Sequence, residues 1–391
     1  MREVVIVAYG RSAIGRAGKG SFAMTRPEDL GGQVLKGVLA KVPNLPLDEI
    51  DDVVVGCSFP EAEQGMNIAK VIASEAGLPE VVGGQTVNRF CSSGLQTIAT
   101  AANAIACDQG DIIIAGGVES MSQIPMGGNI VRPSSRQMID NPKEWTTMGI
   151  TAENVADKYG ITRAEQDEFA VRSHELAAKA RAEGKFKKEI IPVNAVKVVN
   201  KDGIMCKETF EVVDDECIRP GTTTESLAKL RPVFKMGGSV TAGTASQMSD
   251  GASFVVLMEK SKAESLGIKP ICKFVSFAVT GLDPEYMGLG PIYAVNKLLA
   301  RTNTAVEDID LFEMNEAFAS QAIASVRDLN LDMDKVNVNG GAIALGHPLG
   351  CSGSYLTCKL LNEMSANNMS KGIVTMCIGG GMGAAGLFEM L

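Results

Sequence analysis

Cys91 is the first residue in this chain whose type and position suggest nucleophilic chemistry. It precedes apolar residues at helical spacing (Leu95, Ile98, Ala102 and Ile105), which places it at a predicted helix start. The partial positive charge of a helix N-terminus favours a thiolate, so we expect a lowered pKa and a nucleophilic thiol. Most cysteines are instead small buried apolar residues, and position alone leaves both interpretations open.

His347 is one of only two histidines and lies in the glycine-rich segment Asn339-Gly-Gly-Ala-Ile-Ala-Leu-Gly-His-Pro-Leu-Gly-Cys-Ser-Gly. The glycines would let the backbone approach a ligand closely, and an imidazole in such a place can activate a thiol. The second histidine, His174, follows Arg172-Ser in an amphipathic helical pattern. That pattern predicts a solvated surface residue.

Two further segments carry candidate groups. Cys377 is predicted to end a buried strand, and the glycines after it offer backbone N–H groups that could hold an oxyanion. Asn315, in Glu313-Met-Asn-Glu-Ala-Phe318, is interpreted either as a helix N-cap or as a functional amide.

Two glycine-rich strings resemble phosphate-binding motifs but lack their context. Gly381-Met-Gly-Ala-Ala-Gly386 follows a predicted strand, yet we expect no room for the helix and acidic residue that a dinucleotide site needs. Gly15-Arg-Ala-Gly-Lys-Gly20 has neither the glycine spacing nor the Ser or Thr of a phosphate loop. We interpret neither string as a nucleotide site.

The elements that must position these residues form an internal repeat with a period of about 260 residues. Four segments align in order with their counterparts: 33–41 with 294–301, 50–53 with 309–312, 91–94 with 351–354, and 111–117 with 372–379. Each half alternates apolar strands with amphipathic helices, such as a strand at 4–7, a helix from about Glu28 and a strand at 53–55. The pattern predicts an α/β fold with two similar halves stacked in layers around pseudo-twofold symmetry.

A long insertion, roughly residues 119–248, has no counterpart in the second half. Within it, Thr162-Arg-Ala-Glu165 predicts a capping box that opens a helix running to about Glu183, with Gly184 as its terminator. Long loops on a rigid α/β scaffold usually carry substrate contacts, so we assign the insertion to ligand binding. The predicted domains are an N-terminal half (1–118 with about 249–269), the inserted domain (119–248) and a C-terminal half (270–391).

Composition excludes several classes of protein. The 391 residues are 45% hydrophobic and 21% charged, which is typical of a folded, water-soluble protein. A net charge of −9 and the lack of a long apolar run argue against nucleic-acid and membrane partners. Nine scattered cysteines indicate a reducing, cytoplasmic location, and with two histidines and no Cys-x-x-Cys motif we expect no zinc or other metal site.

Taken together, Cys91, Asn315-Glu-Ala-Phe, Gly346-His-Pro and Cys377-Ile-Gly-Gly-Gly resemble, in this order, the motifs of the thiolases. Thiolases are acyl-CoA:acetyl-CoA acyltransferases that split or form 3-ketoacyl-CoA esters, and the resemblance covers essentially the whole chain. It implies a duplicated five-layered α/β/α/β/α core with an inserted CoA-binding loop domain. It further implies a homodimer or homotetramer that takes CoA and acyl-CoA thioesters as substrates and needs no cofactor.

The resemblance also implies roles for individual residues. Cys91 would become acylated, His347 would deprotonate it, and Cys377 would be the general acid and base at the acetyl carbanion. Asn315, through a water, would form one oxyanion hole with His347, and the backbone N–H groups of Cys91 and Gly379 would form a second. The implied substrate-binding residues are Arg219, Ser226, Ser246, Met148 and Phe318.

Within the family, the residues favour the degradative 3-ketoacyl-CoA thiolases over the acetoacetyl-CoA-specific, biosynthetic enzymes. The latter typically carry histidines in the substrate loop, whereas Ser122-Gln-Ile-Pro-Met126 and Thr146-Thr-Met-Gly149 contain none. Degradative enzymes act in fatty-acid β-oxidation, and the resemblance leaves open whether this chain works in a β-oxidation multienzyme complex or in a stand-alone pathway. A condensing enzyme of fatty-acid synthesis would show Cys-His-His or Cys-His-Asn instead, and a noncatalytic acyl-CoA or lipid carrier would lack at least one of the four groups. A thiolate at Cys91 is also compatible with a redox sensor, but any reactive thiol can oxidise, so such oxidation would be either a liability or a regulation added to the enzyme activity.

Overall fold

Strands from both halves of the repeat join in one mixed, ten-stranded sheet within residues 2–391, the part of the chain that this computed structural model describes. The strand order is β10-β11-β12-β9-β1-β8-β5-β3-β4, with β2 beside β8. Its strands are β1 (Val4–Arg11), β2 (Gly15–Arg16), β3 (Asp52–Gly56), β4 (Gln85–Val87), β5 (Ile112–Ser120), β8 (Ser249–Glu259), β9 (Cys272–Gly281), β10 (Leu311–Met314), β11 (Lys371–Ile378) and β12 (Met382–Met390).

The strand order confirms the predicted duplication. In the N-terminal half, β3 and β5 are parallel, while β5–β8 and β8–β1 are antiparallel. The C-terminal half repeats this arrangement in β10, β11, β12 and β9. The two half-sheets meet through only two residue pairs, Val5–Lys273 and Ile6–Cys272.

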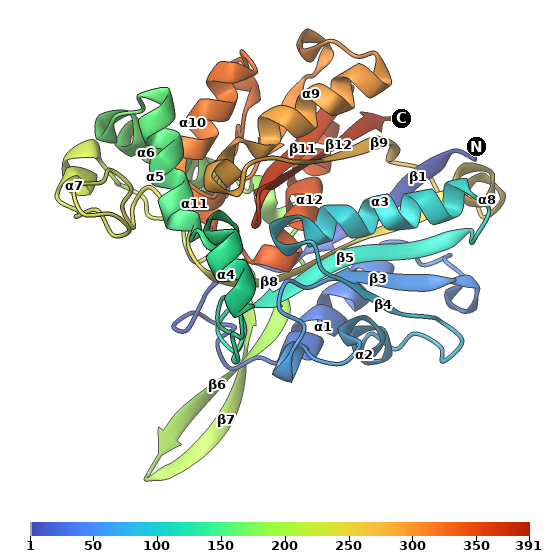
Figure 1. The fold of residues 1–391 in the computed structure, drawn as a ribbon. Coiled ribbons are helices and arrows are strands. Elements are labelled where there is room, and N and C mark those ends of the chain that lie inside the picture. Colours follow the sequence, from blue (N-terminus) through green and yellow to red (C-terminus); the bar gives the residue numbers. More distant parts are fainter. Residues whose placement is uncertain (1) are drawn as a thin grey trace.

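Helices complete five layers, as expected for the α/β/α/β/α core (Figure 1). The pair α1 and α2 covers one outer face, α9 and α10 cover the other, and α3 and α12 lie between the half-sheets. The principal helices are α1 (Pro27–Leu39), α2 (Ile68–Glu75), α3 (Ser93–Ala106), α8 (Lys260–Ser265), α9 (Gly290–Thr302), α10 (Ala319–Asp328), α11 (Ala342–Leu345) and α12 (Leu349–Asn367). None of the helices in the described part of the chain is long and apolar enough to span a bilayer.

The middle layer packs tightly because both of its helices carry glycine where they meet. The apolar positions predicted for α3, from Leu95 to Ile105, are all buried in a core that they share with residues of α12. A Cβ on Gly353 of α12 would lie 2.2 Å from the backbone nitrogen of Leu95 in α3. The first turns of the two helices are therefore in direct contact.

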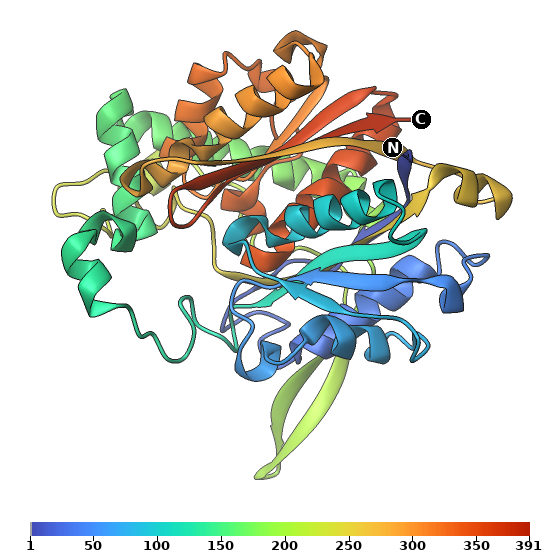
Figure 2. The same ribbon diagram turned by 45° about the vertical axis from the view of Figure 1, so that its right-hand side comes forward.

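The insertion connects β5 to β8, whereas the equivalent connection in the second half is the short turn between β11 and β12. The predicted limits at 119 and 248 fall at the end of β5 and the start of β8. The insertion contains α4 (Ser135–Asp140), α5 (Met148–Tyr159), α6 (Arg163–Ala182), the hairpin β6 (Val193–Lys201) and β7 (Ile204–Val212), and α7 (Thr224–Ala228). The hairpin projects away from the layered core (Figures 1 and 2).

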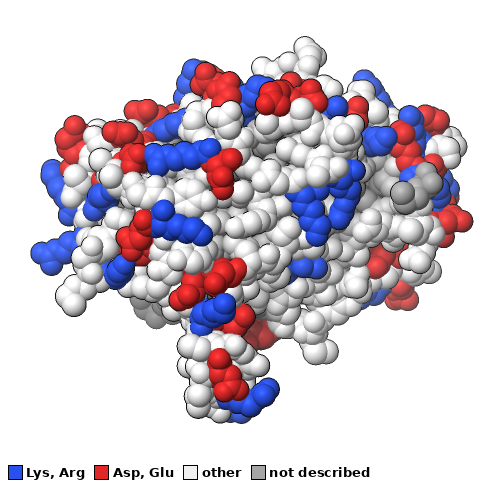
Figure 3. Space-filling view, turned by 45° about the horizontal axis from the view of Figure 1, so that its top comes forward, with Lys and Arg blue, Asp and Glu red and all other residues white. Residues whose placement is uncertain are grey.

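Charged side chains of both signs are interspersed over most of the face shown in Figure 3. The net charge of −9 therefore does not exclude an anionic ligand, because local cations decide such binding.

Candidate active site

A cavity of about 580 Å³ lies between the insertion and the layered core, and three of the predicted chemical side chains line it together: Cys91, His347 and Cys377. These residues belong to separate segments, before α3, before α12 and at the end of β11. The remaining lining comes largely from the insertion and its exit: Met121, Met126, Thr147, Met148, Gly149, Arg219, Val233, Phe234, Ala242, Ala245, Ser246, Gln247 and Met248.

Cys91 lies in a single 3-10 turn (Phe90–Ser92) that leads into α3, so its predicted place at a helix start is confirmed. Phe90, just before it, has a φ of +43°, a conformation that is strained for an aromatic residue. Burial raises the pKa of the Cys91 thiol to about 11, although the backbone N–H groups of Gly379 and Cys91 act in the opposite direction. The expected lowering of this pKa is therefore wrong: the loss of water outweighs the polar groups at the helix start.

His347 is 5% exposed and hydrogen-bonded at both ring nitrogens. Its Nδ1 lies 2.5 Å from Ser352 Oγ, and its Nε2 lies 3.3 Å from Asn315 Nδ2. Ser352 Oγ donates to the carbonyl oxygen of Pro348, so Nδ1–H donates to Ser352 and the lone pair stays on Nε2. Burial lowers the pKa of His347 to about 4, which keeps the imidazole neutral and able to accept a proton at pH 7.

Asn315 is not the N-cap of α10; that position belongs to Phe318. Its backbone N–H donates to Thr375 of β11, and its side chain is fully buried. While Nδ2 faces His347, no group among residues 2–391 hydrogen-bonds to Asn315 Oδ1. A buried amide oxygen in this condition is a place for a bound water or a polar ligand atom.

Cys377 lies next to the last residue of β11 and is fully buried. Its apolar neighbours include Met287 and Phe318, and burial together with the nearby Cys91 raises its pKa well above the usual range for a thiol. Cys377 therefore keeps its proton at neutral pH, as a general acid must.

The exit of the insertion crosses directly over the segments of Asn315 and His347. Ala245 pairs with Phe318, Ser246 N–H donates to the carbonyl oxygen of Ala317, and His347 N–H donates to that of Gln247. Ser246, Phe318 and Met148, to which the resemblance gives a substrate-binding role, line the cavity.

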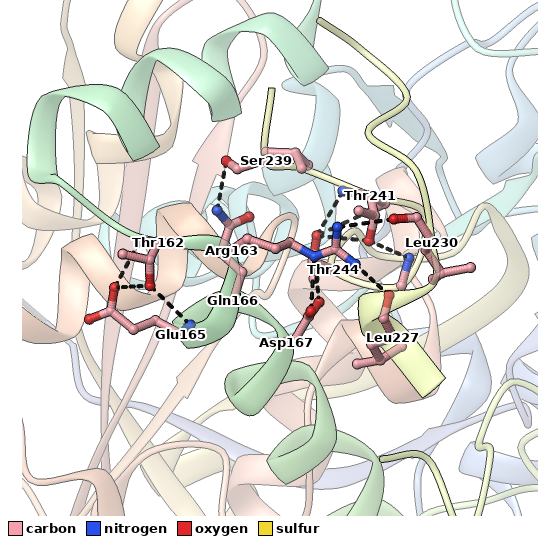
Figure 4. A network of polar contacts seen from close by, with 12 residues as sticks. Thr162, Arg163, Glu165, Gln166, Asp167, Leu227, Leu230, Ser239, Thr241 and Thr244 are labelled. Atoms are coloured by element: carbon pink, nitrogen blue, oxygen red, sulfur yellow. Dashed lines mark hydrogen bonds and ion pairs between the residues drawn. The ribbon is translucent and has the colours of Figure 1, made fainter. Parts of the chain in front are cut away.

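The start of α6 holds the outer wall of the cavity in place (Figure 4). The predicted capping box is confirmed, because Thr162 Oγ1 accepts from Glu165 N–H and Glu165 Oε2 accepts from Thr162 N–H. Next to it, Arg163 pairs with Asp167 at 2.9 Å and donates to backbone carbonyls at the end of α7. Gln166 donates to Ser239 Oγ, so α6 is joined at two points to the segment that carries the cavity residue Phe234.

Two arginines, Arg219 and Arg16, bring positive charge to the cavity. His174 is 4% exposed and its Nδ1 accepts from the backbone N–H of Arg219, so the predicted solvated position is wrong. The helical pattern around His174 gave no sign of this contact. Ser226 is exposed in α7, exchanges hydrogen bonds with Thr223 and does not line the cavity.

Sequence reasoning missed several residues that line the cavity. Arg16 lies in the glycine-rich string that we rejected as a phosphate loop, and only its positive charge could have singled it out. Besides Met148, which the resemblance implies, four further methionines line the cavity although no motif marks them: Met121, Met126, Met248 and Met287. Within residues 2–391, no three His, Cys, Asp or Glu side chains lie close enough together to hold a metal ion.

Comparison with known proteins places this site in a family. Residues 4–261 match the profile of the thiolase N-terminal domain, and residues 268–390 match that of the thiolase C-terminal domain. A 3-ketoacyl-CoA thiolase of Bacillus subtilis is 53% identical over the full length of both chains, and one of Idiomarina loihiensis is 45% identical, also over both full lengths. The crystal structure of an acetyl-CoA acetyltransferase of Bacillus anthracis has a TM-score of 0.89 and 38% identity, covering 100% of this chain and 99% of that one.

Proposed function

The chain belongs to the thiolase family of acyltransferases, and we propose that it cleaves 3-ketoacyl-CoA with CoA through an acyl-enzyme on Cys91. One observation carries the proposal: Cys91, His347 and Cys377 face one apolar cavity, with Asn315 next to His347 Nε2. The three groups supply a nucleophile, a neutral base and a protonated acid in one place.

In the proposed first step, His347 Nε2 takes the Cys91 proton while Sγ attacks the 3-keto carbon of the substrate. Both groups are neutral in the free enzyme, so deprotonation accompanies the attack. The resulting alkoxide would accept from the backbone N–H groups of Cys91 and Gly379, which already face the sulfur.

Collapse of the alkoxide breaks the bond between C2 and C3 and leaves the acyl group on Cys91. The electron pair moves onto acetyl-CoA as its enolate, whose thioester oxygen would accept from His347 Nε2–H and from a water held by Asn315. Asn315 Oδ1, which accepts no hydrogen bond from any group of residues 2–391, supports such a water. Cys377 then protonates C2, and its thiolate takes the proton of the incoming CoA thiol. The CoA thiolate attacks the acyl-enzyme, the shortened acyl-CoA is released, and the Cys91 thiolate that leaves takes its proton back from His347.

The cavity lining supports a broad range of acyl chains. Five methionines contribute flexible, apolar side chains that can adjust to ligands of different shape. The relatives named 3-ketoacyl-CoA thiolase are also more similar in sequence than the acetyl-CoA acetyltransferase. Because of the structural similarity to that acetyltransferase, the second candidate function is that of an acetoacetyl-CoA-specific, biosynthetic enzyme.

We further propose that CoA lies against the insertion near Arg219, Ser226 and Ser246, and that the reaction needs no bound cofactor. We also propose a cytoplasmic location, which the scattered cysteines support. The family resemblance supports a role in β-oxidation, as a homodimer or homotetramer with or without a multienzyme partner. The edge position of β4 supports self-association, since an edge strand can pair with another copy.

The test is thiolysis with acetoacetyl-CoA, 3-ketooctanoyl-CoA and 3-ketohexadecanoyl-CoA, followed by loss of the enolate absorbance. Comparable or faster turnover of the longer chains supports the degradative assignment, and activity with acetoacetyl-CoA alone supports the biosynthetic one. Full activity of Cys91→Ala would contradict the mechanism in either case.

A further inference from the structure

Glu316 is a buried carboxylate directly next to Asn315, and the proposed reaction gives it no task. It is 0% exposed, and none of its hydrogen-bond partners within residues 2–391 lines the cavity. Burying a charged carboxylate is costly unless it accepts several hydrogen bonds, so its partners indicate what it is for.

The partners of Glu316 come from two distant segments. Oε2 accepts from Ser173 Oγ of α6 at 2.6 Å and from the backbone N–H of Ile343 at 3.2 Å, while Oε1 accepts from Asn337 Nδ2 at 2.9 Å. Ser173 Oγ also accepts from the backbone N–H of Gly341 at 3.1 Å. Ile343 and Gly341 belong to the segment that leads into His347.

Two glycines allow these contacts. A Cβ on Gly341 would lie 2.2 Å from the carboxyl carbon of Glu316, and one on Gly340, whose φ is +74°, would lie 2.5 Å from the carbonyl oxygen of Ser173. The glycines before His347 were expected to bring backbone close to a ligand. At these two positions they bring it close to Glu316 and α6 instead.

We propose that Glu316 is a positioning residue that holds the Asn315 segment against the His347 segment and thereby sets the oxyanion hole of the proposed thiolase reaction. Asn315 Nδ2 lies 3.3 Å from His347 Nε2. Glu316, the residue after Asn315, accepts from the backbone N–H of Ile343 in the segment that precedes His347. Glu313, two residues before Asn315, adds a second connection through Lys359, which donates to the carbonyl oxygen of Gly340. The inference rests on the proposed function for its catalytic meaning, but its geometry can be tested without activity.

The kinetic test is a double-mutant cycle between Glu316→Gln and Asn315→Ala. Glu316→Gln keeps the side-chain shape but removes one acceptor, and we expect kcat for thiolysis to fall by about 10- to 100-fold with KM changed less than about twofold. In the Asn315→Ala background, Glu316→Gln is expected to lower kcat by less than about threefold, because the effect of Glu316 on the reaction passes through Asn315. If the kcat losses of the two single variants multiply in full in the double variant, the proposal is overturned.

Glu259→Gln is the matched control. Glu259 is 8% exposed and accepts from Lys262 N–H and Ser261 Oγ, but it stands at the opposite end of β8 from the cavity. We expect this variant to retain wild-type kcat. If Glu316→Gln does not fold, Ser173→Ala removes one donor only, and a several-fold loss of kcat is then expected, whereas wild-type kcat would contradict the proposal.

Histidine NMR separates this inference from the proposed function. The chain has only two histidines, so imidazole ¹⁵N labelling gives two assignable sets of signals. Glu316→Gln is expected to move the Nε2 signal of His347 toward its position in Asn315→Ala, while Glu259→Gln leaves it in place. An unchanged His347 signal in Glu316→Gln would refute the positioning role, whereas a wild-type protein without thiolysis activity would refute only the proposed reaction.

Discussion

Alkylation of Cys91 by iodoacetamide in the free enzyme is expected to accelerate about tenfold per pH unit from about pH 6 to about pH 10, without a plateau. The reason is that burial raises the pKa of Cys91 to about 11 and lowers that of His347 to about 4. At pH 7 the two side chains are thus a neutral thiol and a neutral imidazole. They do not form a thiolate–imidazolium pair.

The size of the effect follows from the thiolate fraction. A cysteine with an ordinary pKa of about 8.5 is roughly 3% thiolate at pH 7, whereas a pKa of about 11 leaves about 0.01%. Alkylation of Cys91 at pH 7 is therefore expected to be about 300-fold slower than that of a freely accessible model thiol, before any steric hindrance.

The assay is the rate of modification of the Cys91 peptide by mass spectrometry across this pH range, with the model thiol in the same buffers. His347→Ala is the control, and its profile is expected to keep the same slope because His347 does not hold the proton in the free enzyme. A plateau at or below about pH 8 in the wild type that disappears in His347→Ala would reveal an ion pair and refute the reasoning.

Three further outcomes are expected from features of the fold and the cavity. Arg219→Ala and Arg16→Ala are each expected to raise KM for CoA about tenfold while kcat changes less than about twofold. The reason is that a charge-assisted hydrogen bond contributes about 1.5–3 kcal/mol. An unchanged KM in steady-state kinetics would contradict this. Gly353→Ala is expected to lower the free energy of unfolding by about 2 kcal/mol in urea titrations, because its Cβ would lie 2.2 Å from the backbone nitrogen of Leu95. Replacing glycine by alanine inside a helix usually raises this free energy by about 1 kcal/mol, and such an increase here would show that the helices move apart to accept the Cβ. Arg11 of β1 is fully buried and pairs with the buried carboxylates of Glu189 and Asp215, each at 2.8 Å. Arg11→Met leaves both carboxylates without their cation and is expected to lower the free energy of unfolding by about 3–5 kcal/mol in the same titrations, and a loss below about 1 kcal/mol would contradict that.

The periodic and repeated features of the fold could be predicted from the sequence. The α/β pattern, the duplication and the capping box at Thr162 depend on residues close together in the chain or on direct internal similarity. The pairing of β1 with β9 could not be predicted, because it joins strands far apart in sequence through two residue pairs that carry no distinctive pattern.

The chemical residues could be named from short motifs, but their environments could not. Burial reverses the expected shift in the pKa of Cys91, and burial is a property of the whole assembled core rather than of the helix start. His174 shows the same limit, because its polar sequence neighbours predict exposure while the backbone of Arg219 covers it. Arg16 and the methionines other than Met148 reach the cavity by tertiary placement alone.

The contact between the first turns of α3 and α12 also bears on how the molecule can come apart. Each half-sheet buries one of its faces against this middle layer, and neither half can keep that layer covered without the other. Partial opening of one half would expose apolar surface from both, so loss of structure is expected to be concerted across the chain. Because Cys91 precedes α3 and His347 precedes α12, the catalytic arrangement is lost in the same step as the fold. We therefore expect inactivation by urea to coincide with global unfolding rather than to precede it.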